Sequence, residues 1–287
     1  MQYEDIALTF NCQNARLTGI LSKPQQATTH GVLFVVGGPQ YRIGSHRQFT
    51  LLARQLAENG IPVFRFDYRG MGDSEGMQRN FTQIDDDIRA ALDCFFQQEL
   101  QLQKVVLWGL CDAASASLHY SHQDPRVSGL VLVNPWVRTE QGMAKAYLKH
   151  YYLQRLLNLS LWKKVVSGRF NPFVALGSLG QQVAKLVFNR ENAKICSQNG
   201  PETDINLPER MLRDLRQFKG KVLCILCTND LTAQEFSDLS SSSPEWKELM
   251  SAERITYLEL EGANHTFSQR NWREQIGAWT IDWCKSK

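Results

Sequence analysis

Short apolar runs alternate with amphipathic stretches along most of the chain. The apolar runs have the length of strands, and the stretches between them repeat apolar residues at the spacing of one helical face. The predicted strands are Asp5–Phe10, Arg16–Ser22, Gly31–Val36, Ile61–Phe66, Val105–Trp108, Val127–Val133, Val222–Cys227 and Ile255–Leu260, and the predicted helices are Arg47–Glu58, Phe81–Gln98, a segment ending at Ser121, and Asn271–Cys284. The first two strands predict a hairpin. The rest predict a mostly parallel central sheet with helices on both faces, an α/β fold.

The segment 134–217 breaks this alternation, because it has no clear strand pattern. Its apolar residues recur at the spacing of one helical face at Leu148, Tyr152, Leu156 and Leu159. We therefore expect a helical cap inserted into the sheet domain. The predicted organisation is a first core part of residues 1–133, a cap of residues 134–217 and a second core part of residues 218–287.

The predicted cap is rich in basic residues. Between Val137 and Arg169, several Lys and Arg residues stand against Glu140 as the one acidic residue. Such a run is ordinarily a solvated basic face. The alternative is a surface that meets an acidic substrate, an anionic carrier or a membrane surface.

Composition and charge exclude some classes of protein. The chain has 287 residues, of which 43% are hydrophobic, and a formal net charge of +3. It has neither the dense basic stripe nor the motif of a nucleic-acid-binding protein, so we expect no nucleic-acid partner. Residues 1–5 lack the basic and apolar regions of a secretory signal, and no stretch approaches the roughly 18 apolar residues of a membrane span. We expect a cytoplasmic protein without a transmembrane segment, and the sequence leaves its oligomeric state open.

The cysteines indicate free thiols. Their number, seven, is odd, and the chain is long for a disulfide-stabilised scaffold. Cys224 and Cys227 form a CxxC motif within a predicted strand, where an offset of three places the two side chains on opposite faces. They cannot bind one ion together, so we expect two buried apolar side chains. We expect no metal and no cofactor.

The segment Gly109-Leu110-Cys111-Asp112-Ala113 has the spacing of the G-x-S-x-G nucleophile elbow, with Cys in place of Ser and Ala in place of the second Gly. An elbow holds its nucleophile in a strained strand-to-helix turn, so the residues two before and two after it must be small. Gly109 and Ala113 meet that requirement. The N–H groups at the start of the following helix favour a thiolate. We therefore expect Cys111 to be a nucleophile rather than a buried structural cysteine.

A thiolate nucleophile needs a base, and the base needs a carboxylate that orients it. His265 lies on a Gly-containing loop after the last predicted strand, and Asp230 lies just beyond the preceding strand. Catalytic groups of parallel sheets gather at the carboxyl ends of the strands. The order nucleophile, acid, histidine is the one found in α/β-hydrolases. We predict a catalytic triad of Cys111, Asp230 and His265.

Acyl transfer also requires backbone donors for the oxyanion. The N–H of Asp112, next to the nucleophile, is the first predicted donor. The second should come from the loop after the third strand, where Pro39 has no N–H. Gln40 is therefore the candidate, with Tyr41 next. Tyr41 and His46 are candidates for substrate contact, although His46 can also start the following helix.

The glycine-containing segment Asp67–Ser74 misses the G-x-G-x-x-G spacing of a dinucleotide-binding turn. We interpret it as a structural loop beside the active site.

Together these features resemble the α/β-hydrolase superfamily over almost the whole chain. Asp67–Ser74 is similar to a loop that many members carry after the fourth strand, and the Cys elbow is similar to that of dienelactone hydrolases. Gly37–Phe49, Gly109–Ala116 and Asn229–Phe236 resemble signatures of the exosortase A system-associated hydrolases, type 1. That resemblance implies a bacterial cytoplasmic enzyme linked to exopolysaccharide production and protein sorting, and it implies no particular substrate.

The leading hypothesis is hydrolysis of an ester or thioester through an acyl-enzyme, with a small-molecule or carrier-linked acyl substrate. One alternative is acyl transfer to a sugar or carrier hydroxyl, which shares the same acyl-enzyme. Another is a non-enzymatic binding module on a hydrolase fold.

Overall fold

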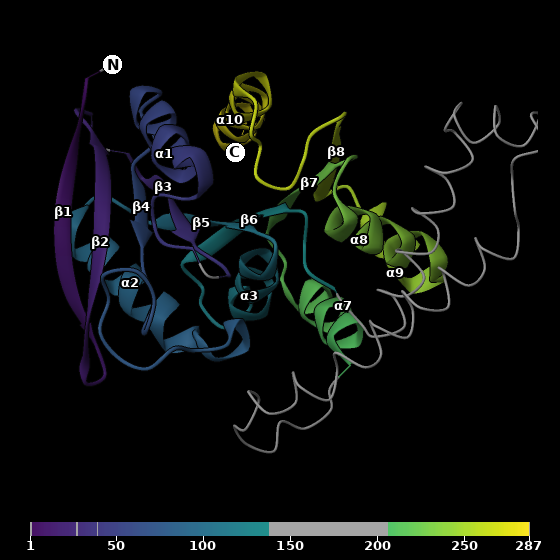
Figure 1. Cartoon of the computed structure of the whole chain (residues 1–287), viewed down its shortest axis with the longest axis horizontal. Coiled ribbons are helices and arrows are strands. Elements are labelled where there is room, and N and C mark those ends of the chain that lie inside the picture. Colours follow the sequence, from purple (N-terminus) through teal and green to yellow (C-terminus); the bar gives the residue numbers. More distant parts are fainter. Residues whose placement is uncertain (1, 27, 39, 138–205, 287) are drawn as a thin grey trace, which may run out of the picture. The chain divides into compact units, whose positions relative to one another are not determined.

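The computed structural model describes residues 2–26, 28–38, 40–137 and 206–286 (Figure 1). The helices and strands of these residues are β1 (Tyr3–Cys12), β2 (Ala15–Pro24), β3 (His30–Val35), η1 (Ser45–Arg47), α1 (Gln48–Glu58), β4 (Val63–Phe66), η2 (Phe81–Gln83), α2 (Asp85–Gln98), β5 (Lys104–Leu110), α3 (Asp112–Ser121), β6 (Val127–Val133), α7 (Leu207–Gln217), β7 (Lys221–Cys227), α8 (Leu231–Ser242), α9 (Pro244–Met250), β8 (Ile255–Leu260) and α10 (Arg270–Lys285). Each predicted strand and helix outside residues 138–205 is present, with shifts at the ends.

One sheet of eight strands lies at the centre, in the order β1-β2-β4-β3-β5-β6-β7-β8. The hairpin β1–β2 joins β4 in antiparallel fashion, and all later pairs are parallel. This arrangement confirms the α/β-hydrolase fold class. Because the strands from β3 onward run the same way, the loops that follow them emerge at a common edge.

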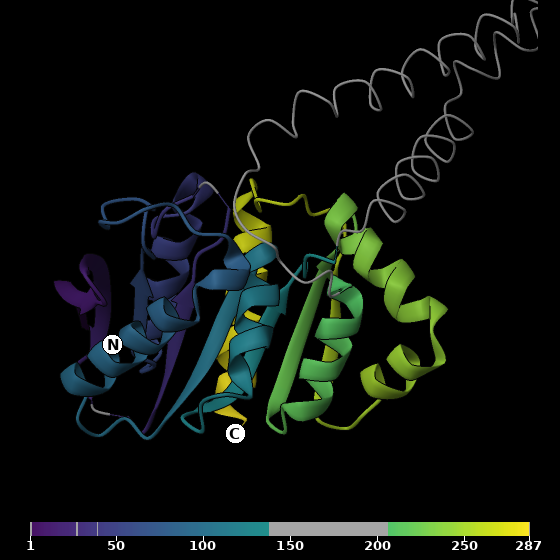
Figure 2. The same cartoon turned by 90° about the horizontal axis from the view of Figure 1, so that it is seen from below.

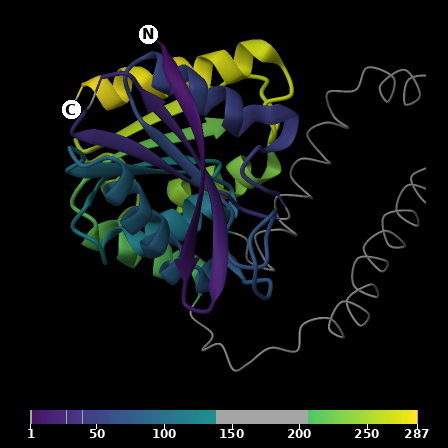
Figure 3. The same cartoon turned by 90° about the vertical axis from the view of Figure 1, so that its left-hand side faces the viewer.

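Helices cover both faces of the sheet. Helices α1 and α10 lie side by side on one face, as Figures 1 and 3 show. Helices α2, α3, α7 and α8 cover the other face, and Figure 2 shows them in front of the sheet with the yellow α10 behind it. Each face has its own apolar core. Cys224 belongs to one core and Cys227 to the other, which confirms that this CxxC spans the sheet.

The predicted helix Phe81–Gln98 is interrupted near its start. Asn80 accepts a hydrogen bond from the Thr82 N–H and caps a single 3₁₀ turn, Phe81–Gln83, which ends at Ile84 with a φ of −107° and a ψ of 14°. The regular helix begins at Asp85, whose carboxylate and those of the next two residues lie near the positive helix end. Local capping therefore overrides the longer apolar pattern.

The chain divides into two compact units, one of residues 1–142 and 206–287 and one of residues 143–205. Helix α7, which falls within the predicted cap of residues 134–217, belongs to the first unit and packs on α3. The predicted helical repeat and basic run of the cap lie outside the described residues. In the part of the chain that is described, no helix combines the length and the apolar character of a membrane span.

Candidate active site

Cys111 lies at the turn between β5 and α3. Its backbone angles, a φ of 64° and a ψ of −125°, are values that residues other than Gly rarely adopt. The strained turn is held by backbone hydrogen bonds: the Cys111 N–H donates to the Val133 carbonyl at 2.9 Å, and the Trp136 N–H donates to the Cys111 carbonyl at 3.2 Å. A Cβ on Gly109 would lie 2.5 Å from the Ala113 carbonyl oxygen, so that position must be Gly. The geometry is that of a nucleophile elbow.

Ala113 stands where the elbow pattern has its second Gly, and the neighbouring loop makes room for it. A Cβ on Gly37 would lie 2.9 Å from the Ala113 Cβ and 2.0 Å from Oδ1 of Asp112. The extra methyl group of Ala113 therefore fits because Gly37 has no side chain. This departure from the pattern is compatible with a well-formed elbow.

Asp230 and His265 meet at the same edge of the sheet. His265 Nδ1 lies 2.7 Å from Oδ2 of Asp230. The other carboxylate oxygen of Asp230 accepts a hydrogen bond from the Thr232 N–H at 3.0 Å, so this residue also caps α8. Since both oxygens are engaged, the carboxylate has a fixed direction toward the imidazole. The two residues, 35 positions apart, come together as their places after β7 and β8 predict.

The imidazole of His265 is hydrogen-bonded to the side chains of both Asp230 and Cys111. Hydrogen bonds with the Asp230 and Cys111 side chains raise the pKa of His265 from 6.5 to about 10, although partial burial opposes this shift. With Nδ1 directed at Asp230, Nε2 is the ring atom left for the sulfur. The ring is thus protonated at neutral pH and can donate a proton to a leaving group beside Cys111. The three predicted residues form one connected site.

Comparison with known proteins places this geometry in a family. The family model described as serine aminopeptidase, S33, matches residues 28–223. The chain belongs to this family. It is an α/β-hydrolase. The matched segment contains Cys111, while Asp230 and His265 follow it.

Solved structures share the fold of this hydrolase at low sequence identity. An esterase of Pyrococcus furiosus has a TM-score of 0.63 at 15% identity, with 99% of this chain and 91% of the esterase covered. Dienelactone hydrolase from Anabaena variabilis has a TM-score of 0.60 at 14% identity, with 99% and 97% covered. Est1E from Butyrivibrio proteoclasticus, solved with ferulic acid bound, has a TM-score of 0.62 at 11% identity, with 98% of each chain covered. No curated protein sequence matches the chain.

The side chain of Asp112 changes the picture of the oxyanion hole. Its carboxylate accepts hydrogen bonds from the N–H of Gly38 at 2.8 Å and the N–H of Ala113 at 2.9 Å. Burial raises the pKa of Asp112 despite these donors. This carboxylate belongs to the residue whose N–H is the first predicted oxyanion donor, and it occupies the neighbouring N–H groups of Gly38 and Ala113.

The loop after β3 carries the candidate residues Gln40 and Tyr41. It is held in place by the segment that follows β4. Asp67, almost fully buried, accepts hydrogen bonds from the Arg42 N–H at 2.7 Å and from the Arg42 guanidinium. This confirms the structural role expected for the segment from Asp67 to Ser74. Gln40 lies half-buried on the anchored loop, and Tyr41 is 40% exposed with the Arg42 guanidinium over its ring.

His46 lies in the single turn η1 that precedes α1, with a φ of 54°. That left-handed backbone makes it part of a tight loop rather than of the helix proper. The roles proposed for Gln40, Tyr41 and His46 remain predictions. Among the described residues, no group of His, Cys, Asp and Glu side chains is arranged as a metal site.

A second His–Asp pair lies between α3 and α7 and was not predicted. His119 of α3 lies 2.6 Å from the Asp214 carboxylate of α7, and both side chains are 1% exposed. Arg213 and Arg210 also approach Asp214, at 3.2 and 3.7 Å. The helical position of His119 was visible in the sequence, but its partner, 95 residues away, was not.

Proposed function

We propose that this hydrolase cleaves an ester or thioester bond with the Cys111 sulfur as nucleophile. The observation that supports this most is the strained elbow of Cys111 joined through His265 to the buried carboxylate of Asp230. The names of the structural neighbours, an esterase and a dienelactone hydrolase, agree with ester chemistry. Low identity to them leaves the acyl group open.

The reaction would proceed in two halves. The Cys111 thiolate attacks the carbonyl carbon, and the tetrahedral intermediate expels the alcohol or thiol, which takes its proton from His265. An acyl thioester on Cys111 and a neutral imidazole remain. A water molecule then attacks this thioester while His265 accepts its proton, and the carboxylic acid leaves as Cys111 regains its electron pair. Asp230 holds the imidazole in the tautomer that both halves require.

The resemblance of three segments to the exosortase A system-associated hydrolases supports a narrower proposal. The acyl substrate would be a small molecule or a carrier-linked intermediate of exopolysaccharide production, handled in the cytoplasm. Transfer of the acyl group to a sugar or carrier hydroxyl would use the same acyl-enzyme and differ only in the second nucleophile.

Turnover of short p-nitrophenyl esters and acyl thioesters tests the mechanism. Cys111→Ala should abolish turnover, whereas the matched control Cys284→Ala, at the other partly exposed cysteine of the described residues, should retain it. Full activity of the Cys111→Ala variant would contradict the mechanism. Product analysis in the presence of a polyol distinguishes the two reactions, since free acid indicates hydrolysis and a new polyol ester indicates transfer.

A further inference from the structure

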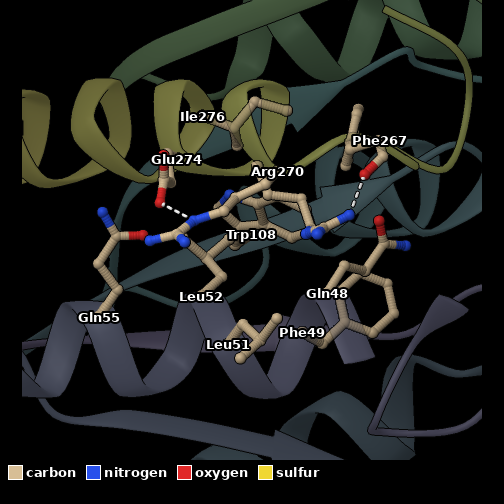
Figure 4. Close-up of a pocket in the computed structure, with 11 residues that line it drawn as sticks. Gln48, Phe49, Leu51, Leu52, Gln55, Trp108, Phe267, Arg270, Glu274 and Ile276 are labelled. Carbon is tan, nitrogen blue, oxygen red and sulfur yellow. Dashed lines mark hydrogen bonds and ion pairs between the residues drawn. The ribbon is translucent and has the colours of Figure 1, made fainter. Parts of the chain in front are cut away.

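A cavity of about 430 Å³ lies between α1 and α10, on one face of the sheet (Figure 4). This volume is within the range found for sites that bind small molecules. Its apolar wall is formed by Phe49, Leu51, Leu52, Trp108, Phe267 and Ile276. Figure 4 shows Leu51 and Leu52 rising from α1, Ile276 facing them from α10, and Trp108 between the two helices. Neither Cys111, Asp230 nor His265 lines the cavity, so it is separate from the active site.

Two buried polar side chains in this wall have no partner. Gln48 is 4% exposed, and within the described part of the chain neither its amide nitrogen nor its amide oxygen is hydrogen-bonded. The Trp108 Nε1–H is likewise buried without an acceptor among these residues. A buried polar group without a partner destabilises the folded chain, so a ligand that supplies the partner is favoured. Because the Gln48 amide gives up no hydrogen bond when it turns toward the cavity, it is free to meet a ligand, whereas the Trp108 Nε1–H is enclosed.

The rim of the cavity is positively charged. Arg270 and Arg273 lie in the first turn of α10, and α1 begins at Gln48, so the positive ends of two helices add to the two guanidinium groups. Arg270 pairs with Glu274 at 2.6 Å. Arg273 donates to the carbonyls of Phe267 and Ser268 at 2.7 and 2.9 Å. No carboxylate of the described residues forms an ion pair with Arg273, which leaves its charge for a bound anion.

We propose that the cavity between α1 and α10 binds an amphipathic carboxylate, such as a medium-chain fatty acid. The hydrocarbon part would lie among the apolar side chains, and the carboxylate would accept hydrogen bonds from Gln48 and Arg273. An ammonium head group would be repelled by Arg273, and a plain hydrocarbon would leave the Gln48 amide without a hydrogen-bond partner.

Calorimetric titration of the full chain with octanoate tests the proposal. We expect one saturable site for octanoate, at least tenfold weaker binding of 1-octanol, and no measurable binding of octylammonium. Absence of a saturable octanoate site would overturn the proposal, and so would equal affinity for octanoate and octanol.

Two variants with matched controls place the site. Gln48→Leu should weaken octanoate binding at least tenfold and keep or raise the melting temperature, because it removes an unmet buried amide. Leu51 lies at the edge of the cavity and is 39% exposed, and Leu51→Trp should block octanoate binding. The controls are Gln98→Leu and Leu100→Trp. Gln98 is an exposed residue at the end of α2, on the other face of the sheet, and Leu100 is 90% exposed. Unchanged binding in both cavity variants would overturn the assignment.

A last comparison separates this cavity from the pocket for the acyl group of the substrate. Protein carrying one N-ethylmaleimide adduct on Cys111, verified by mass, should bind octanoate with unchanged affinity. Loss of binding in the adduct would show that octanoate occupies the catalytic cleft and would overturn a separate site. Failure of the proposed ester chemistry would leave each of these binding results unchanged.

Discussion

Two His–Asp pairs with nearly equal hydrogen bonds lie in different regions of the hydrolase. In the active site, His265 and Asp230 are 2.7 Å apart, and between α3 and α7, His119 and Asp214 are 2.6 Å apart. The pKa of His265 is raised to about 10, whereas burial lowers the pKa of His119 below its usual value. The same contact thus accompanies opposite protonation states.

The surroundings of each imidazole explain the difference. The His265 side chain is 33% exposed and meets Cys111 in addition to Asp230, so its charged form is hydrated and has two partners. His119 is fully buried, and its Nε2 has no partner among the described residues. A charged His119 would add an unmet buried N–H, and the nearby Arg210 would repel it. The contact with a carboxylate therefore favours a charged imidazole only where a second partner and some solvent are available.

The largest expected effect is the loss of turnover when the charge of Asp230 is removed. Asp230→Asn should lower kcat/KM for a p-nitrophenyl ester roughly 10²–10⁴-fold, because the amide no longer holds the required tautomer. Asp214→Asn should leave kcat/KM of the folded protein within about twofold. Equal losses of kcat/KM in the two variants would contradict the different roles of the two pairs.

Stability should respond in the opposite order. Asp214→Asn should lower the free energy of unfolding by about 2–4 kcal/mol, because it disrupts a buried hydrogen-bonded group with two arginines near it. Asp230→Asn should cost less than Asp214→Asn, since Asn is as good a helix N-cap as Asp and the pair with His265 is partly exposed to solvent. Denaturant unfolding measures both, and a smaller loss for Asp214→Asn than for Asp230→Asn would contradict the assignment of roles.

The two histidines should give opposite pH dependence of stability. The raised pKa of His265 makes its contribution complete below about pH 6.5 and lost as the pH rises toward about 10. The lowered pKa of His119 makes its contribution complete above about pH 6.5 and lost as the pH falls. Unfolding of His265→Gln and His119→Gln, compared with the parent protein from pH 5 to 10, isolates each slope. Slopes of the same sign would refute the assigned protonation states.

The fold and the meeting of Cys111, Asp230 and His265 could be predicted because both depend on local or ordered signals. The elbow around Cys111 is contiguous, and Asp230 and His265 each directly follow a recognisable strand. The pairing of His119 with Asp214 depends on how α3 packs against α7, which no local pattern encodes. Likewise, the Asp112 carboxylate reaches Gly38 across 74 positions, so its effect on the oxyanion hole appears only in three dimensions.

The smallest expected effect concerns that carboxylate. Asp112→Ser removes a carboxylate from beside the first predicted oxyanion donor. It also frees the N–H groups of Gly38 and Ala113, which that carboxylate occupies. We expect kcat/KM for activated esters to rise a few-fold, whereas the Asp230 variant loses activity. A fall in kcat/KM would mean that the carboxylate positions the loop at Gly38. It would contradict the view that the carboxylate competes with the substrate for backbone N–H groups.

The central claim is that Cys111 forms a covalent acyl-enzyme with His265 as its proton donor and acceptor. Intact-mass measurement after rapid mixing with a panel of activated acyl donors tests it most directly. The account predicts a mass increase of one acyl group, removed by hydroxylamine and mapped to Cys111, and a longer-lived adduct in His265→Gln. An adduct on another residue, or turnover by the Cys111→Ala variant at the parent rate, would contradict it.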